Sequence, residues 1–426
     1  MKTKLLPMAA LTGIFLFAAC TQENPAVGDE ESNAPSEITL LLNSGGDGLT
    51  RAGRPVNSSA AANQVDRVQL KLYQSDDGAT GWTVVSDAFD NNGIVQWTVG
   101  PTDEGTPGQS SHEAQQKLKV KNLLASKHYK VVAYGYKGMG TGGNNCAYTL
   151  TDNTGEFTTT ALADEGANGA NIEEIFAGNQ TFQTNAEKKI TSAVKVSMNR
   201  MVAGLLGYFK NIPVKKPHPQ TMVLTPIQYV RVYTVAKTTQ FKFPSTVDFN
   251  GTGTQTTAKT LLLEYNVKTI VDGNATGKYD EQVAAATSGT EIFTIDAKTG
   301  SVVTVPNSIL AGRFIIPFVS SVTDQNTLSV ELLAADGSTV LKTWDVKVNT
   351  SNGGAETGLV DAYKYDIKRN HFYSIGKKMK SDRIKDPNIP DTDPDEDKAI
   401  DLNQDNDIIL TLHDSWDVVY DMGLSD

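Results

Sequence analysis

The sequence predicts an all-β protein with two β-sandwich domains and an extended C-terminal strand. Short runs in which apolar and polar residues alternate recur between Gly-rich and Asn-rich turns, a pattern typical of strands with one buried face. The chain has 426 residues, whereas single hydrophobic cores rarely exceed about 250–300 residues. Two cores are therefore expected. The one stretch with a helical pattern, 161–176, contains glycines and predicts a short helix at most.

Changes in composition divide the chain into six predicted segments. Polar residues at 183–186 indicate a joint, after which the run 194–198 opens a second series of strands. Prolines and a dense acidic run predict an exposed, extended linker before the last strand. The predicted segments are an export signal at 1–20, a propeptide with a removable first strand at 21–51, sandwiches at 52–185 and 186–381, a linker at 382–407 and a C-terminal strand at 408–426.

The N-terminus has the features of a bacterial lipoprotein signal. Lys2 and Lys4 precede a short apolar stretch, 5–17, and two alanines lead directly to Cys20. The apolar stretch is too short to span a membrane. We therefore predict that Cys20 is lipidated after export. An ordinary secretory signal followed by a chance cysteine is the alternative, and it predicts export as well.

The amino-acid composition argues against several classes of binding partner. The net charge of −11 argues against nucleic acid and against an anionic membrane surface, so that the lipid is the only membrane contact expected. Cys146 is the only other cysteine, so no intrachain disulfide remains once Cys20 is lipidated. Five histidines and two cysteines also leave little material for metal sites, and we expect neither a metal nor a cofactor.

The C-terminal segment has a strongly two-faced strand pattern. Apolar residues occupy every second position after Ile408, and Asp414 interrupts them. Because one strand over the whole length would be far longer than usual, we expect 408–412 to join its own sheet and 416–424 to project away from it. A hairpin at 413–415 is the alternative that remains open. The apolar residues of the projecting part are Trp416, Val418, Tyr420, Met422 and Leu424.

A second short apolar strand is predicted near the N-terminus, at 36–43. Ile38, Leu40 and Leu42 share one face of it, and a Gly-rich loop follows. Arg51, which precedes Ala52 in that loop, is an accessible site for a trypsin-like protease.

Together these elements resemble the fimbrillin family, the subunits of lipoprotein-derived, protease-assembled (type V) pili. Beyond the lipobox and the apolar first strand, the resemblance rests on Thr50-Arg51-Ala52, the strand 65–73, Asn199-Arg200-Met201-Val202-Ala203, the Arg369-Asn370-His371-Phe372-Tyr373-Ser374-Ile375 element and the terminal Trp416.

The resemblance implies transthyretin-like Greek-key sandwiches and a mechanism of assembly. A lipidated precursor reaches the outer membrane, and an Arg-specific trypsin-like protease cuts between Arg51 and Ala52. The strand with Ile38, Leu40 and Leu42 then leaves with the lipid. The terminal strand of a neighbouring fimbrial subunit takes its place as a donor strand, which gives a cell-surface fimbrium. The resemblance thus implies that the donor residues are Trp416, Val418, Tyr420, Met422 and Leu424. Host or bacterial surface ligands are expected as further partners.

Motifs that would indicate enzyme chemistry are incomplete. Residues 138–143 fit G-x-G-x-x-G, but no helix follows to hold a pyrophosphate. Asp401, Asn403, Asp405 and Asp407 have the spacing of a calcium loop but lack its glycine and its glutamate. His371 lies among aromatic residues, where a packed sheet residue is expected. We therefore predict no enzyme and no catalytic residue.

Two functions other than a polymerising subunit remain open. A pilus tip adhesin, or a permanently anchored surface lipoprotein, would bind a glycan or host protein. A tip subunit should lack a donor strand, and an anchored one should keep its first strand and its lipid. A surface hydrolase is the third class, and the sequence contains no set of residues for it.

Overall fold

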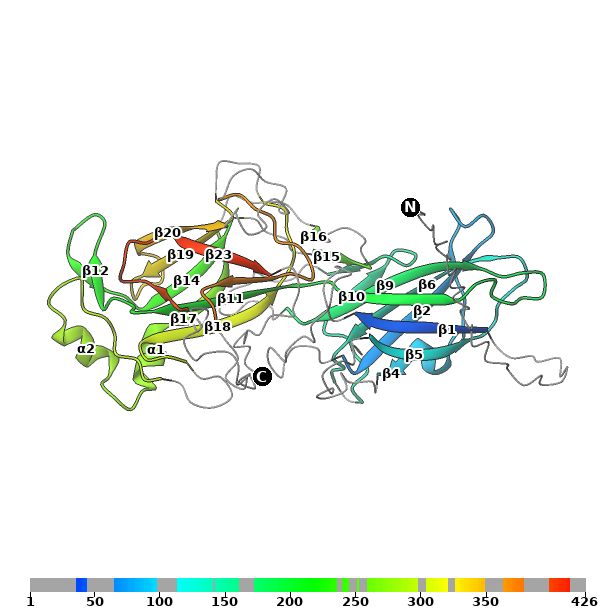
Figure 1. The fold of residues 1–426 in the computed structure, drawn as a ribbon, viewed down its shortest axis with the longest axis horizontal. Coiled ribbons are helices and arrows are strands. Elements are labelled where there is room, and N and C mark those ends of the chain that lie inside the picture. Colours follow the sequence, from blue (N-terminus) through cyan, green and yellow to red (C-terminus); the bar gives the residue numbers. More distant parts are fainter. Residues whose placement is uncertain are drawn as a thin grey trace, which may run out of the picture. The chain divides into compact units, whose positions relative to one another are not determined.

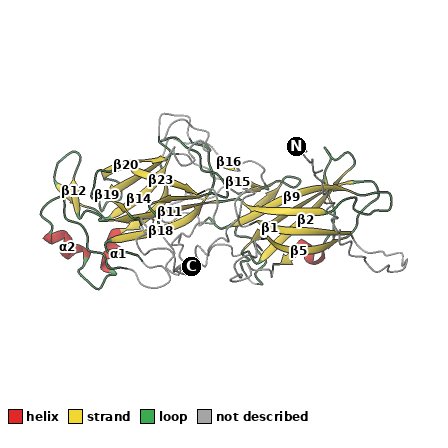
Figure 2. Ribbon diagram, in the orientation of Figure 1, coloured by secondary structure: helices red, strands yellow, loops and turns green. Residues whose placement is uncertain are grey.

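Two large β-sheets make up most of the described chain (Figures 1 and 2). Strands dominate and helices are short, which confirms the predicted all-β fold class. All described residues belong to one compact unit, Ser36–Asp426. The computed structural model describes residues 36–43, 65–97, 113–140, 142–160, 172–235, 240–244, 251–252, 259–297, 304–320, 326–348, 363–378 and 398–413.

The first sheet has eight strands in the order β3-β2-β6-β9-β10-β1-β5, and β4 also pairs with β2. Neighbours are antiparallel except for β1 and β10, which run parallel. A 3-10 turn, Asp90–Gly93, precedes β4. The strands are β1 (Ser36–Asn43), β2 (Arg67–Ser75), β3 (Thr83–Val84), β4 (Ile94–Gln96), β5 (Glu113–Val120), β6 (His128–Tyr136), β9 (Ile175–Gln183) and β10 (Val194–Arg200).

Alternate residues of these strands face one hydrophobic core. In β2, Val68, Leu70 and Leu72 are buried, while the residues between them are half-buried. Strands β1, β5, β6, β9 and β10 contribute apolar side chains to the same core. The amide of Lys121, just after β5, donates to the carbonyl of Ala88 at 2.8 Å. The far edge of the sheet therefore comes back beside the segment after β3 and closes over the core.

The second sheet has nine strands in the order β17-β14-β19-β20-β23-β21-β11-β18, and β22 also pairs with β11. The hydroxyl of Tyr265 on the end strand β17 lies 2.6 Å from the carbonyl oxygen of Gly207 on β11 and 3.4 Å from that of Ala311 on the other end strand, β18. The two ends of the sheet therefore meet around a second core. The strands are β11 (Ala203–Lys210), β14 (Tyr229–Thr234), β17 (Thr260–Asn266), β18 (Ser308–Ile315), β19 (Leu328–Leu333), β20 (Val340–Val348), β21 (Phe372–Ile375), β22 (Ile400–Asp401) and β23 (Ile408–His413).

Smaller elements complete the fold. Asn266 caps α1, since its side chain accepts a hydrogen bond from the amide of Thr269 at 3.1 Å. Neither helix is long and apolar enough to cross a membrane among the described residues. These elements are α1 (Val267–Asp272), α2 (Tyr279–Ala285), the hairpin β12 (Lys215–Pro217) and β13 (Leu224–Pro226), and a four-stranded sheet of β16 (Gly251–Thr252), β15 (Gln240–Phe243), β8 (Phe157–Thr159) and β7 (Leu150–Asp152).

The joint predicted at 185 and 186 lies inside the first sheet. The run 194–198, predicted to open the second series, is β10 and pairs with β9 and β1. Of the polar residues at 183–186, Gln183 ends β9 and Thr184 forms a bridge to Ile190. The turn follows at Asn185, whose side chain accepts from the amide of Lys189 at 2.8 Å. Only after β10 does the chain pass through the buried Met201 into the second sheet.

The short helix allowed for 161–176 is absent from the part of that stretch which the structure describes. Ile175 and Phe176 begin β9 and are fully buried. Glu174, within the same stretch, is buried and forms an ion pair with Arg200. A tertiary contact therefore overrides the local pattern.

The described part of the acidic linker predicted over 382–407, residues 398–407, is paired with the second sheet. Lys398 forms a backbone pair with Lys377, and β22 then runs parallel to β11. Leu402 is fully buried in the second core. Apolar side chains among the acidic residues thus anchor 398–407 to the second sheet. Residues 379–397 lie outside the described part of the chain.

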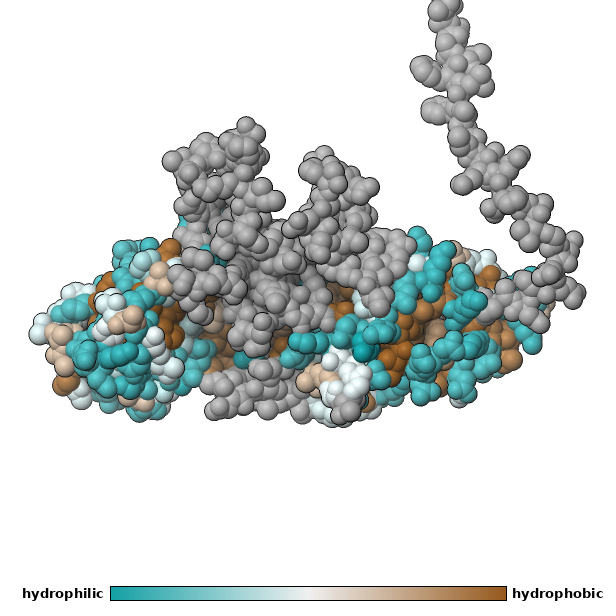
Figure 3. Space-filling model, turned by 90° about the horizontal axis from the view of Figure 1, so that it is seen from below, coloured by the Kyte–Doolittle hydropathy of each residue, from teal (hydrophilic) through white to brown (hydrophobic). Residues whose placement is uncertain are grey.

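The visible surface is largely hydrophilic. Figure 3 shows hydrophilic residues over most of the coloured atoms on this face, with separate hydrophobic strips between them. The most exposed large apolar side chains are Met222 and Val223, in the turn of the β12–β13 hairpin, at 71% and 63% exposure. Apolar residues that are exposed singly or in pairs are common on folded proteins and by themselves indicate no site.

Candidate functional site

The most unusual feature of the fold is the position of its first strand. β1 lies between β10 and β5, parallel to the first and antiparallel to the second (Figure 1). It pairs with β10 from Ile38 to Asn43 and with β5 along its whole length. We call β10, β5 and the space between them the β1 seat. Among the described strands, β5 is at the end of the sheet and β1 is its only neighbour.

The inward face of β1 forms part of the first core. Ile38, Leu40 and Leu42 are 1%, 0% and 8% exposed. They pack in one cluster with β10 residues such as Val196 and with Val120 on β5. Burial of three such side chains contributes roughly 5–9 kcal/mol, at about 1.5–3 kcal/mol each. An empty seat would therefore expose an apolar groove with unpaired backbone groups on both walls.

The outward face of the seat is rimmed by basic side chains. Lys117 and Lys119 on β5 and Lys195 on β10 are all exposed. In the register of the sheet, Thr39 lies between Lys117 and Lys195, and Glu37 lies opposite Lys119. The seat therefore has an apolar floor and a basic rim.

One polar atom on the floor of the seat lacks a partner. Gln116 on β5 lies directly opposite Leu40 and shares the inward face with the buried Val120. Its Oε1 is buried and accepts no hydrogen bond within the described chain. The resident Leu40 has no side-chain donor to offer it. A buried acceptor without a partner costs about 1–3 kcal/mol.

Only some of the predicted site residues fall within the described chain. Ile38, Leu40 and Leu42 lie in the seat, as just described. Cys20, the cleavage site at Arg51 and Ala52, and the donor residues Trp416, Val418, Tyr420, Met422 and Leu424 lie outside it. The chain that connects β1 to β2, 44–66, includes Arg51.

The start of the C-terminal segment has a place in its own sheet. β23 pairs in parallel with β20 from Ile408 to Leu410 and antiparallel with β21 from Leu410 to His413. Ile408 and Leu410 are at most 1% exposed. The segment that follows, 414–426, is therefore attached to a strand in the interior of the second sheet.

The two motifs on which the family resemblance partly rests meet in space. Arg200, at the end of β10, is fully buried and donates to Glu174 Oε1 at 2.6 Å and to Asn370 Oδ1 at 3.4 Å. Its guanidinium also lies 4.9 Å from the ring centroid of Phe176. The amide of Asn370 donates to the carbonyl of Val202 at 2.9 Å. The strand next to β1 is thereby tied to the loop before β21, a contact that the sequence alone did not reveal.

His371 and the acidic motif both have structural partners. Nδ1 of His371 lies 2.7 Å from the carbonyl oxygen of Arg369. Asp401 accepts from Asn211 at 2.6 Å, while Asp405 pairs with a lysine, Lys342, that lowers its pKa. Asp407 pairs with Lys347 and raises the pKa of this lysine to about 12. No cluster suited to a metal ion occurs in the described residues.

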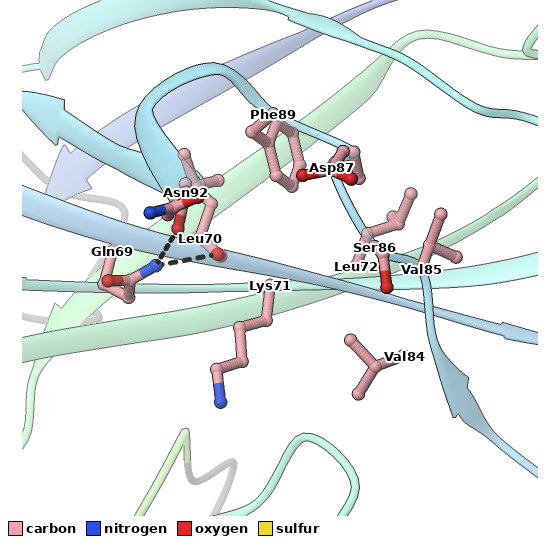
Figure 4. A pocket seen from close by; sticks show the side chains of 12 residues that line it. Gln69, Leu70, Lys71, Leu72, Val84, Val85, Ser86, Asp87, Phe89 and Asn92 are labelled. Carbon is pink, nitrogen blue, oxygen red and sulfur yellow. Dashed lines mark hydrogen bonds between the residues drawn. The ribbon is translucent and has the colours of Figure 1, made fainter.

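A surface hollow of about 200 Å³ lies between β2 and the segment after β3 (Figure 4). Gln69 donates to the carbonyls of Leu70 and Asn92 at 3.1 and 3.0 Å, which joins its two walls. Lys71 extends from β2 away from Phe89, and its Nζ lies 2.7 Å from Asp152 Oδ2. Ser86 is the only hydroxyl group in the lining, and no histidine lies beside it to act as a base. The arrangement offers packing and no recognisable reaction chemistry.

No family model and no curated protein matches this sequence. Among solved structures, the fold is similar to the fimbrial anchor protein Mfa2 from Porphyromonas gingivalis, at 10% identity and a TM-score of 0.29, over 80% of this chain and 90% of that one. It is also similar to a fimbrial assembly protein from Parabacteroides distasonis (12%, TM-score 0.30, over 80% and 91%) and a cell adhesion protein from Bacteroides eggerthii (13%, TM-score 0.36, over 89% and 95%). Because these TM-scores and identities are low, we transfer no function and no residue role from these proteins.

Proposed function

We propose that this chain is a structural subunit of a cell-surface fimbrium. It is exported as a lipoprotein through Cys20, cleaved after Arg51 and polymerised by strand exchange through its C-terminal strand. The observation that supports this most is the position of β1, which holds apolar residues inside a sheet yet precedes Arg51 by only eight residues in the sequence. After cleavage, only non-covalent contacts would hold β1 in its seat.

The physical consequence of losing β1 favours assembly. The empty seat would expose backbone donors and acceptors on β10 and β5 beside an apolar floor, and an added strand could satisfy both. The tail, 414–426, offers five alternating apolar residues, from Trp416 to Leu424. Their burial would contribute roughly 8–15 kcal/mol before the cost of ordering the tail is subtracted. Insertion into the next copy, head to tail, does not close and therefore yields a filament.

A permanently anchored surface lipoprotein is the second candidate. A chain that is never cut would keep β1 in its seat and the lipid at Cys20. The two functions differ in one measurable property, the N-terminal residue of the protein at the cell surface. A polymerised subunit should begin at Ala52, and an anchored one at lipidated Cys20.

Substitution of Arg51 by alanine is expected to stop assembly. Without the arginine, a trypsin-like protease has no site before Ala52, so β1 stays covalently attached and keeps the seat filled. The surface protein should remain a lipidated monomer, detected by mass spectrometry of its N-terminus and by electron microscopy of the cells. Arg54→Ala is the matched control, because Arg54 lies three residues after Arg51 in the sequence and precedes a proline. Normal filaments from Arg51→Ala would contradict the processing step.

A further inference from the structure

The side chains of β1 do not fully complement the hydrogen-bonding groups and charges of the β1 seat. Leu40 leaves Gln116 Oε1 buried and without a partner among the described residues. On the outward face, Glu37 is the only acidic residue of β1, while three exposed lysines rim the seat. A strand with a hydrogen-bond donor at the centre of its apolar face and further acidic residues on its polar face would complement the seat better.

The tail of this same chain has both properties. On its apolar face, Trp416 and Tyr420 each have a side-chain donor, and Tyr420 stands at the centre of the five apolar positions. On its polar face are Asp417 and Asp421. We infer that the β1 seat selects the tail of a second copy of this chain, with Tyr420 opposite Gln116 and the tail aspartates against the lysine rim. This inference rests on the proposed strand exchange and names its specificity determinants.

The central pairing does not depend on the direction in which the tail enters. Leu40 is the middle of the three buried positions of β1. With Tyr420 at the position of Leu40, Val418 and Met422 take the positions of Ile38 and Leu42, in either order. The same central residue therefore meets Gln116 whether the tail runs like β1 or opposite to it.

The direction of the tail relative to β1 determines which tail aspartate lies opposite which lysine. If the tail runs like β1, Asp417 takes the position of Glu37, opposite Lys119. If it runs the other way, Asp421 takes the position of Thr39, between Lys117 and Lys195. Both directions place a carboxylate beside an ammonium group, which steers encounter and fixes the register.

A peptide-binding experiment separates this inference from the proposed function. The recipient is the full chain cleaved after Arg51, with Val418→Pro in its own tail so that it cannot donate a strand. The probe is a synthetic peptide of residues 414–426, and its affinity is measured by fluorescence titration. We expect Tyr420→Phe in the peptide to weaken binding about tenfold, because Gln116 again lacks a donor. With Gln116→Leu in the recipient, the same change should matter less than twofold.

Two control variants and the binding of the wild-type peptide distinguish the proposed pairing from strand exchange itself. Gln180→Leu, on an exposed face of β9, should leave the tenfold effect intact. Gln116→Leu should raise the melting temperature of the uncut precursor, because it removes a buried acceptor that lacks a partner; a lowered melting temperature would overturn the inference. If the wild-type peptide binds but Tyr420→Phe changes nothing, the pairing is wrong while strand exchange stands. If the wild-type peptide does not bind at all, the proposed function itself fails.

Discussion

Truncation after His413 is expected to leave a folded, processed subunit that cannot polymerise. The cut removes only 414–426, while β23 keeps its pairing with β20 and β21. The monomer should therefore retain its melting temperature within a few degrees. Filaments should be absent in electron micrographs, and the protein should elute as a monomer in size-exclusion chromatography.

Truncation six residues earlier, after Asp407, is the informative control. It also removes β23, whose Ile408 and Leu410 are buried in the second core. Loss of these two side chains alone should cost about 3–6 kcal/mol, a large fraction of the total stability of a typical domain. We expect that variant to unfold or aggregate. If truncation after His413 unfolds the monomer as well, the tail belongs to its own fold and cannot be a donor strand.

Replacement of Arg200 by alanine is expected to be among the most destabilising single changes in the chain. The guanidinium is fully buried and pairs with Glu174, whose side chain is 6% exposed. Removal of one partner leaves a buried charge without compensation, which typically costs 3–5 kcal/mol. Urea denaturation should show a loss of about this size. We also expect weaker seating of β1, because Arg200 ends the strand on which β1 pairs.

Two further variants separate charge from packing at this position. Arg200→Met combined with Glu174→Met should recover most of the lost stability, since an apolar pair of similar volume can replace a buried ion pair. Lys268→Ala, which breaks an exposed pair with Asp280, should cost no more than about 1 kcal/mol. A small effect of Arg200→Ala would show that the buried ion pair does not hold the end of β10.

Local sequence patterns predicted the strands but not their partners. The alternation of Ile38, Leu40 and Leu42 correctly indicated a strand with one buried face. Its parallel partner β10 lies more than 150 residues further along the chain, and no local pattern encodes such a pairing. The same limit explains why polar residues near Asn185 resembled a joint when they form a turn within one sheet.

The contacts of polar residues were also not predictable from the sequence. Acidic composition indicated a linker up to Asp407, yet the buried Leu402 and the pairing of lysines with Asp405 and Asp407 hold that region against the second sheet. Conversely, the sequence marked the segments around Arg200 and Asn370 without showing that they touch. Buried polar contacts between distant segments depend on the tertiary fold, so composition alone cannot predict them.

In the proposed exchange, the seat holds β1 before assembly and the tail of another subunit afterwards. Carbodiimide cross-linking of filaments grown from equal amounts of ¹⁴N- and ¹⁵N-labelled protein can detect this exchange, because the tail aspartates and the lysine rim are reactive partners. We predict mixed-isotope cross-links from Asp417 to Lys119, or from Asp421 to Lys117 or Lys195, together with loss of the Glu37–Lys119 cross-link that is expected in the precursor. Persistence of the Glu37–Lys119 cross-link in filaments, with tail cross-links only inside single chains, would contradict strand exchange.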